Sequence, residues 1–198
     1  MPDVLESIAL NHSRSLIEKS QRGDQQAFGK LVGLWFKRIY NFSLKYFGDH
    51  DLAMEATQQT FIAVYRKLGS LKNPDSFRYW LYKVALNSCR EEERRMKKRS
   101  WLSLFGFTGS TEPVEYMFEP EREYQKLENE DMLARLLRSL PDEQRAVVIM
   151  KEYEGLKFRE IAEALGIPEN TAKTRLYNGL NNLRKKIKER GLNLREGG

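Results

Sequence analysis

The sequence predicts an all-α protein in which two small helical domains are joined by a flexible linker. Through most of its 198 residues, apolar side chains recur every three or four positions, as they do on one face of a helix. No stretch of the sequence alternates apolar and polar residues as a half-buried strand would. Helical spacing is lost from about residue 100 to residue 120, where Gly, Ser, Thr and Pro accumulate as in a linker. We therefore expect domains at residues 1–99 and 130–190, a linker at 100–129 and a tail at 191–198.

Four helices are expected in the first domain. A weak apolar pattern over residues 4–20 predicts the first one. Asp24 is a natural N-cap for a second helix, and Gly48 ends it because glycine readily adopts the left-handed conformation of a helix end. A third helix is predicted over residues 49–68. The fourth begins near residue 75, after an Asn-Pro turn signal, and turns one apolar side toward a core: Phe77, Trp80, Leu81 and Val84.

The second domain is expected to end in a helix-turn-helix, the motif that places its second helix in the major groove of DNA. Apolar residues at i, i+3, i+4 and i+7 from Phe158 to Leu165 predict the first helix of the motif. Gly166 suits the end of this helix, and Pro168 suits the first turn of the next. A further helix begins at Pro141 and precedes the motif.

The second helix of this motif turns its polar and basic residues outward. Arginine pairs with guanine and asparagine with adenine, while threonine and lysine suit phosphates and thymine methyl groups. The alternative is an ordinary helical hairpin with a solvated polar face. The candidate DNA-binding residues on this helix are Asn170, Thr171, Lys173, Thr174, Arg175 and Asn178.

Composition favours a polyanionic partner and excludes several classes of site. The net charge is +6, and net basic segments at residues 1–100 and 141–198 flank a net acidic one. A single cysteine, Cys89, and two histidines allow no internal disulfide or closed zinc site, so neither a metal nor another cofactor is expected. We interpret Cys89 as a buried apolar residue. No signal peptide or run of 18 apolar residues is visible, so a soluble, cytoplasmic protein without membrane insertion is expected.

Three stretches, at residues 48–68, 76–99 and 140–187, together resemble one known family. They contain GDHDLAMEATQQTFIAVYRKL, FRYWLYKVALNSCREEERRMKKR and LPDEQRAVVIMKEYEGLKFREIAEALGIPENTAKTRL. In this order they are similar to the polymerase-binding, promoter-melting and minus-thirty-five-reading segments of extracytoplasmic-function (ECF) sigma factors of the sigma-70 family. The resemblance covers residues 20–99 and 130–190. It implies the short form of the family, with a region 2-like bundle and a region 4-like helix-turn-helix domain.

The resemblance also implies roles for residues of the first domain. A polar loop would hold flipped bases, and a basic track would hold the displaced strand, offsetting the roughly 1–2 kcal/mol per step that duplex opening costs. The loop residues are Lys72 and Asn73, with Asp75 and Ser76 beside them. The track residues are Arg78, Lys83, Asn87 and Arg90, continued by Arg94 and Arg95. The residues that would bind core polymerase are Glu55, Gln58, Gln59, Phe61 and Arg66.

Some residues depart from the family pattern or admit two interpretations. Met54 and Gln59 stand where acidic residues are usual, which weakens the negative charge of the polymerase-facing helix, and Asn170 stands where Gly is common. Tyr79 and Tyr82 lie off the apolar stripe and are candidates for base stacking. Aromatic and apolar residues in the linker either meet a partner or fold back onto a domain: Trp101, Leu102, Leu104, Phe105 and Phe107.

The expected function is that of a non-enzymatic initiation factor. The implied partners are core RNA polymerase, promoter DNA as duplex and as unpaired non-template strand, and an anti-sigma factor, which the family commonly has. One alternative is a helix-turn-helix regulator, which would need an effector pocket or a receiver-like repeat upstream. Another is a sigma-like interaction module that does not read DNA. Catalysis is not expected, because the sequence has no phosphate-binding loop and no clustered His and acid.

Overall fold

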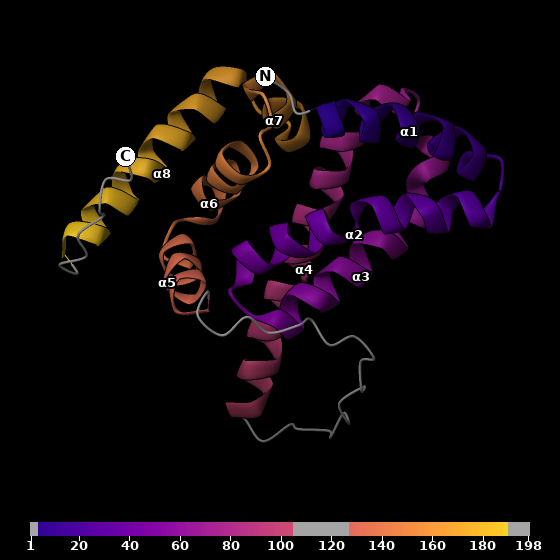
Figure 1. The fold of residues 1–198 in the computed structure, drawn as a ribbon. Helices are drawn as coiled ribbons and strands as arrows, with labels where there is room; N and C mark the ends of the chain where they lie inside the picture. The colour runs from indigo at the N-terminus through magenta and orange to yellow at the C-terminus, as the bar shows by residue number, and fades with distance from the viewer. Residues whose placement is uncertain (1–3, 105–126, 190–198) are drawn as a thin grey trace.

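The computed structural model describes residues 4–104 and 127–189, and in these ranges all regular secondary structure is helical (Figure 1). The N-terminal domain contains α1 (Val4–Gln21), α2 (Gln25–Phe47), α3 (His50–Lys67), η1 (Leu68–Ser70), η2 (Pro74–Ser76) and α4 (Phe77–Leu104). The C-terminal domain contains α5 (Leu127–Arg138), α6 (Asp142–Val148), the π-helical turn η3 (Ile149–Tyr153), α7 (Phe158–Leu165) and α8 (Glu169–Glu189). The predicted all-α class with two helical domains is confirmed.

Capping residues explain where α2 begins and ends and where α3 begins. The Asp24 carboxylate accepts a hydrogen bond from the Ala27 amide at 3.0 Å, which satisfies one of the unpaired donors at the start of α2. Gly48 ends α2 with φ of 61°, and Asp49 caps the next helix by accepting from the Leu52 amide at 2.9 Å. The boundaries expected from sequence at residues 24 and 48 are therefore confirmed.

Helix α4 is longer than expected and runs into the predicted linker. The sequence places the linker from residue 100, but α4 continues to Leu104. Ion pairs one turn apart, such as Arg94–Glu91 at 3.2 Å and Lys97–Glu93 at 3.8 Å, support the charged segment that precedes this end and lacks an apolar stripe. Trp101 lies exposed on its last turn. The expected return of helix near residue 121, together with Phe105 and Phe107, falls outside the described residues.

Aromatic side chains from α2 and α4 form the core of the N-terminal domain. Trp35 is buried, its indole nitrogen donates to the Ser13 hydroxyl at 3.0 Å, and its ring meets Phe77 edge to face at 5.7 Å. Trp80 is partly buried against the same core. The predicted apolar side of α4 is thus the side that packs. Cys89 is also fully buried and donates to the Ser43 hydroxyl at 3.6 Å, as its interpretation as a packing residue requires.

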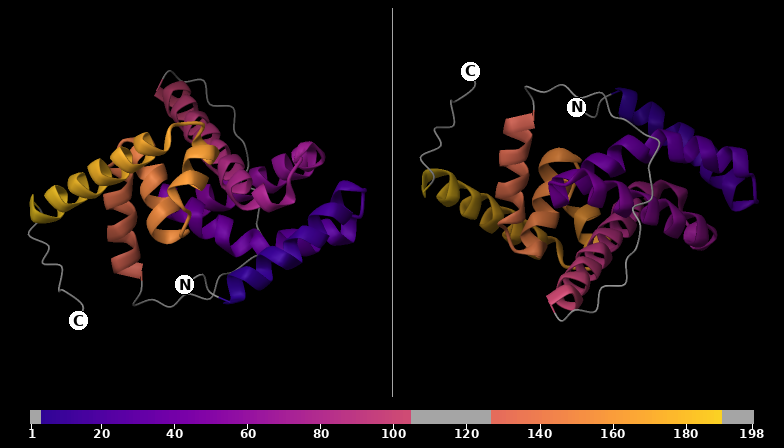
Figure 2. Two further views of the ribbon diagram at one scale, coloured as in Figure 1. Left: turned by 90° about the horizontal axis from the view of Figure 1, so that it is seen from above. Right: turned by 90° about the horizontal axis from the view of Figure 1, so that it is seen from below.

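The two domains pack directly against each other. α5 and η3 contact α2, α7 contacts α4, and buried residues of both domains belong to one continuous hydrophobic cluster. Figure 1 shows α5 and α6 beside the end of α2, and both views in Figure 2 show α8 extending away from the N-terminal domain. A Cβ atom on Gly48 of α2 would lie 2.7 Å from the Cβ of Ala134 on α5, so backbone and small side chains meet closely here. This arrangement is a tertiary feature that the sequence left open.

Candidate nucleic-acid and polymerase interfaces

The helix-turn-helix has the geometry that the sequence predicts. Gly166 ends α7 with φ of 65°, and its amide donates to the Ala162 carbonyl. The Lys157 amide donates to the Glu160 carboxylate at 2.7 Å and so satisfies a free donor at the start of α7. Three residues then separate α7 from α8, the spacing typical of this motif. The buried side of α8 faces α6 and α7, which leaves the opposite side for solvent or a ligand.

The first three turns of α8 carry the candidate DNA-reading side chains, and three of the six are exposed. Asn170, Thr174 and Asn178 are exposed, while Thr171 and Lys173 are half-buried. The Thr174 hydroxyl donates to the Asn170 carbonyl at 2.9 Å. Lys173 pairs with Glu169 one turn earlier at 3.1 Å, an exposed contact that a phosphate could replace at little cost.

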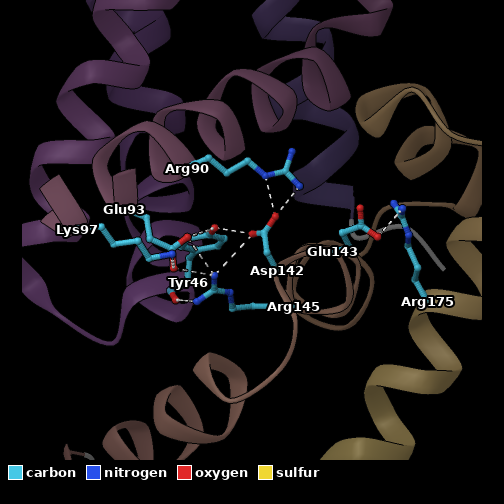
Figure 3. Close-up of polar contacts among 8 residues, drawn as sticks. All are labelled: Tyr46, Arg90, Glu93, Lys97, Asp142, Glu143, Arg145 and Arg175. Carbon is cyan, nitrogen blue, oxygen red and sulfur yellow. Dashed lines mark hydrogen bonds and ion pairs between the residues drawn. The ribbon is translucent and has the colours of Figure 1, made fainter. Parts of the chain in front are cut away.

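Arg175 is held by an acidic residue of its own domain. Its side chain is 23% exposed, and its guanidinium lies 2.6 Å from the carboxylate of Glu143 in the first turn of α6 (Figure 3). The arginine that sequence reasoning assigned to DNA is therefore engaged within this structure. The pair joins residues 32 positions apart, so it depends on how α6 and α8 pack.

The α4 track splits into exposed and engaged residues. Lys83 and Asn87 are exposed, and Arg90 lies on the same side of the helix because these positions are four and three residues apart. Arg90 is not free, however: its guanidinium lies 2.7 Å from Asp142 of the C-terminal domain. The loop residues Lys72 and Asn73 are exposed, and the Asn73 side chain caps η2 by accepting from the Asp75 amide at 3.0 Å.

Arg78 and Tyr82 are covered in this structure, whereas the sequence suggested Arg78 for the basic track and Tyr82 for base stacking. Arg78 is 9% exposed and donates to the Glu154 carbonyl, while the fully buried Tyr82 donates to the Glu154 carboxylate. The two residues lie one turn apart on the side of α4 that the C-terminal domain covers. Tyr79 stays partly exposed; burial and a hydrogen bond with Glu163 raise the pKa of its phenol.

The candidate polymerase-binding residues on α3 also separate into two groups. Gln58, Gln59 and Glu55 lie half-buried along one side, where Gln59 donates to Glu55 at 3.0 Å, and Arg66 is exposed. Phe61 is instead 8% exposed and stacks on Phe36 with ring centroids 6.1 Å apart, so it is a core residue.

Sequence reasoning missed two exposed apolar residues on α3, Ile62 and Tyr65. Tyr65 is 58% exposed although it meets Phe28 edge to face. Helical spacing from Glu55 through Gln58, Gln59 and Ile62 to Tyr65 would have placed both on the polar side of the helix. An apolar pair among these polar residues is typical of a surface that binds another protein.

A polar cluster joins the two domains at the start of α6 (Figure 3). The Tyr46 hydroxyl donates to Asp142 at 2.5 Å, and Arg90 donates to the other oxygen of the same carboxylate at 2.9 Å. The buried Arg145 guanidinium donates to the Tyr46 carbonyl at 3.3 Å, lies 3.9 Å from the centre of the Tyr46 ring, and pairs with Glu93 at 3.5 Å. Burial acts to raise the pKa of Asp142, but the hydrogen bonds from Tyr46 and Arg90 and the two guanidinium charges outweigh it and lower that pKa.

The described residues contain neither a metal-ligating cluster nor a reactive thiol. No group of three or more His, Cys, Asp or Glu residues in the described ranges converges as metal ligands would. Burial raises the pKa of the Cys89 thiol to about 12, so the reactive thiolate is not populated near neutral pH. Among residues 4–104 and 127–189, no helix is both long and apolar enough to cross a membrane.

Known families and structures match both domains. The sigma-70 region 2 family matches residues 31–100, and the family described as sigma-70, region 4 matches residues 130–183. The ECF RNA polymerase sigma factor SigW of Bacillus subtilis (strain 168) is 30% identical over 178 residues, covering 87% of this chain and 95% of that protein. The RNA polymerase sigma-H factor of Pseudomonas aeruginosa is 27% identical, covering 83% of this chain and 88% of its own length.

Solved structures share the fold. CnrH in complex with the cytosolic domain of CnrY superimposes with a TM-score of 0.68 at 22% identity, over 90% of this chain and 98% of that one. The sigma factor RpoE from Bartonella quintana, in complex with the anti-sigma factor NepR, gives a TM-score of 0.60 at 19% identity, over 81% and 96%.

Two helical domains with these matches, the second ending in a helix-turn-helix, define a sigma-70-type transcription factor. The chain belongs to the sigma-70 family, and within it to the ECF RNA polymerase sigma factors. It is a sigma factor that directs initiation at promoters, as the resemblance in its sequence implied.

Proposed function

We propose that the chain performs this function through three separate surfaces, one for core RNA polymerase and two for promoter DNA. The observation that carries the proposal is the exposed row of hydrogen-bonding side chains on the first three turns of α8, which follows a three-residue turn. A helix presented in this way fits the major groove and reads base edges. The chain acts as a binding protein in the cytoplasm and catalyses no reaction of its own.

The polymerase surface is the outward side of α3. Glu55, Gln58, Gln59 and Arg66 supply hydrogen bonds and charge, and the exposed Ile62 and Tyr65 supply apolar area. Exposed aromatic residues beside polar groups are common among the residues that contribute most to protein–protein affinity. Phe61 contributes from beneath by stacking on Phe36 and fixing the position of the helix.

The minus-thirty-five surface is the outward side of α8. Asn170, Thr171, Thr174 and Asn178 offer amides and hydroxyls to base edges and phosphates, while Lys173 and Arg175 add positive charge. Arg175 must leave Glu143 to reach DNA.

The minus-ten surface is formed by the loop and the adjoining side of α4. Lys72 and Asn73 are exposed at the loop, and Lys83 and Asn87 continue along α4 toward Arg90. Polar pockets and basic tracks of this kind suit unpaired bases and the strand they belong to. Arg78 takes part only if the C-terminal domain moves away from α4.

Regulation by an anti-sigma factor is part of the proposal. The similar chain from Bartonella quintana was solved in complex with the anti-sigma factor NepR. The similar fold over most of both chains supports a partner of the same class for this protein.

Run-off transcription with purified sigma-free core polymerase tests the proposal. Adding the chain should allow specific initiation from promoters of its own genome, and a Tyr65→Ala variant should need a higher concentration for the same yield. Gly33→Ala is the matched control, because Gly33 is exposed on α2 with open space around it. Polymerase that starts at no specific site with the wild-type chain would contradict the proposal.

A further inference from the structure

One side chain of α1 is hydrogen-bonded to the start of the loop that the proposed function assigns to unpaired bases, residues 68–76. The Gln21 amide nitrogen donates to the Leu68 carbonyl at 2.9 Å and to the Leu71 carbonyl at 2.8 Å. A side-chain amide has two N–H donors, so this loop takes both of them. The Leu71 amide also donates to the Leu68 carbonyl at 3.0 Å, and the three groups together close one turn of the backbone.

α1 also contacts the far end of this loop. The Arg14 guanidinium lies 3.3 Å from the carboxylate of Asp75 in η2. The Ser13 hydroxyl accepts the hydrogen bond from the buried Trp35. The Trp35 ring in turn meets Phe77, the first residue of α4 and the residue that follows the loop. The loop is therefore held from α1 at its start and at its end.

We propose that α1 positions this loop for base recognition and that Gln21 is the main positioning residue. The proposal rests on the proposed function, in which Lys72 and Asn73 meet the unpaired minus-ten strand, and it names the residue that fixes their backbone. These two exposed residues directly follow Leu71, whose carbonyl Gln21 binds. Gln21 acts through the loop backbone.

The loop needs such a support because discrimination between bases by hydrogen bonds depends on geometry. Hydrogen bonds weaken steeply as their angle departs from linear, and the residues of a binding site must be held within about 0.5 Å of the productive geometry. The buried Leu68 and Leu71 anchor the loop in the core, but Gly69 and Ser70 between them are exposed. Without the two hydrogen bonds from Gln21, this backbone samples other conformations and the reading side chains move with it.

The contacts are placed to affect the loop more than the stability of the domain. Gln21 is an exposed residue, and both side chains of the Arg14–Asp75 pair are more than half exposed, so losing either contact costs the fold little. The buried Leu16 and Ile17 hold α1 against the core. α1 therefore stays in place when Gln21 is replaced.

The first test measures discrimination in run-off transcription with core polymerase and a promoter that the wild-type chain uses. Single-base changes in its minus-ten and minus-thirty-five elements give one discrimination ratio for each element. Gln21→Met keeps the length of the side chain but has no donor, so the minus-ten ratio should fall about three- to tenfold while the minus-thirty-five ratio stays unchanged. Gln26→Met is the matched control, because Gln26 is exposed in the first turn of α2. An unchanged minus-ten ratio, or an equal fall at both elements, would overturn the proposal.

The second test measures the loop directly, by amide hydrogen exchange of the full chain without polymerase or DNA. The Leu71 amide is hydrogen-bonded within the loop, so its exchange reports how often the loop opens. This amide should exchange about three- to tenfold faster in Gln21→Met than in Gln26→Met. Equal exchange at Leu71 in the two variants would show that Gln21 does not hold the loop, and the proposal would be wrong.

The two measurements separate the possible failures. If exchange at Leu71 rises but the minus-ten ratio does not fall, the proposal is wrong and the proposed function stands. If the wild-type chain supports no specific transcription, the proposed function fails, and the proposal fails with it. If Gln21→Met does not fold, Arg14→Met takes its place, at a side chain 57% exposed, and should lower the minus-ten ratio in the same direction. A ratio equal to that of the wild type would then overturn the proposal.

Discussion

The two helices that carry the proposed DNA contacts, α8 and α4, differ in what surrounds them. The reading side of α8 faces away from the rest of the chain, and its one strongly engaged arginine is held within its own domain. α4 lies along the domain junction, so its residues differ: Lys83 and Asn87 are exposed, Arg90 is paired with Asp142, and Arg78 is covered. The proposed minus-thirty-five surface is thus formed by one domain alone, whereas the proposed minus-ten surface depends on how the two domains are arranged.

The largest expected effect is on stability and lies at the junction between the two domains. Replacing Arg145 with Met removes a buried guanidinium that pairs with the half-buried Glu93 and Asp142 and packs on the Tyr46 ring. The free energy of unfolding should fall by about 3 kcal/mol. Chemical denaturation of the full chain measures it. Arg159→Met is the control, since its pair with Glu163 is highly exposed and should matter little. Equal midpoints would show that the junction is not a stabilising contact.

The next largest effect is on promoter binding and concerns α8 alone. Arg175→Ala should cost about 1–3 kcal/mol of promoter binding, concentrated at one base pair, if the arginine reads a base after leaving Glu143. Binding of the polymerase complex to a panel of single-base promoter variants measures this. A uniform loss across the panel would instead assign Arg175 to a phosphate.

A smaller effect tests the packing of α8 against α6 within the second domain. A Cβ on Gly179 of α8 would lie 2.8 Å from the Val148 side chain of α6, so Gly179→Ala should destabilise by about 1–2 kcal/mol through overpacking. Gly29→Ala on α2 has open space and should instead stabilise by up to about 1 kcal/mol. Thermal unfolding of both variants measures the contrast. A stabilised Gly179→Ala would mean that α6 and α8 lie farther apart than described.

The smallest expected effect is the pH dependence of the stability that the domain junction provides. Asp142 faces Tyr46 from α2, Arg90 and Glu93 from α4 and Arg145 on α6, and its pKa lies below the ordinary value of 3.8. The ionised carboxylate therefore stabilises the fold above about pH 4, and this contribution disappears as the pH falls through the lowered pKa. The stability difference between wild type and Asp142→Asn should shrink below pH 4.

A nearby carboxyl group has the opposite sign and provides the comparison. Burial raises the pKa of Glu154 despite its hydrogen bond from Tyr82 and the charges of Lys45, Arg38 and Arg78. The protonated Glu154 carboxyl therefore favours the folded state below pH 4.5, its ordinary pKa. This contribution to stability is lost as the pH rises through the raised pKa. Denaturation of Asp142→Asn and Glu154→Gln across acidic pH should show slopes of opposite sign relative to wild type. Slopes of the same sign would contradict the environments described for these groups.

Local chemistry alone determined the elements of this protein. The spacing of apolar residues, the cap at Asp24 and the glycines at 48 and 166 predicted the helices, because such signals act over one or two turns. Three stretches of the sequence likewise predicted membership of the sigma-factor family. The end of α4 was predicted less well, because the helical spacing of apolar residues is lost at residue 100 although the helix continues to Leu104.

Only the tertiary structure decided which candidate residues are available. Phe61 lies in the core, Tyr82 and Arg78 lie under the second domain, and Arg90 and Arg175 are paired with α6. These outcomes depend on contacts between residues dozens of positions apart, such as Arg90 with Asp142. Helical periodicity defines which side of a helix is apolar, but it does not say which polar side chains a second domain will cover. Which polar side chains are covered depends on how whole domains pack, because burial and charge pairing across many helices act together.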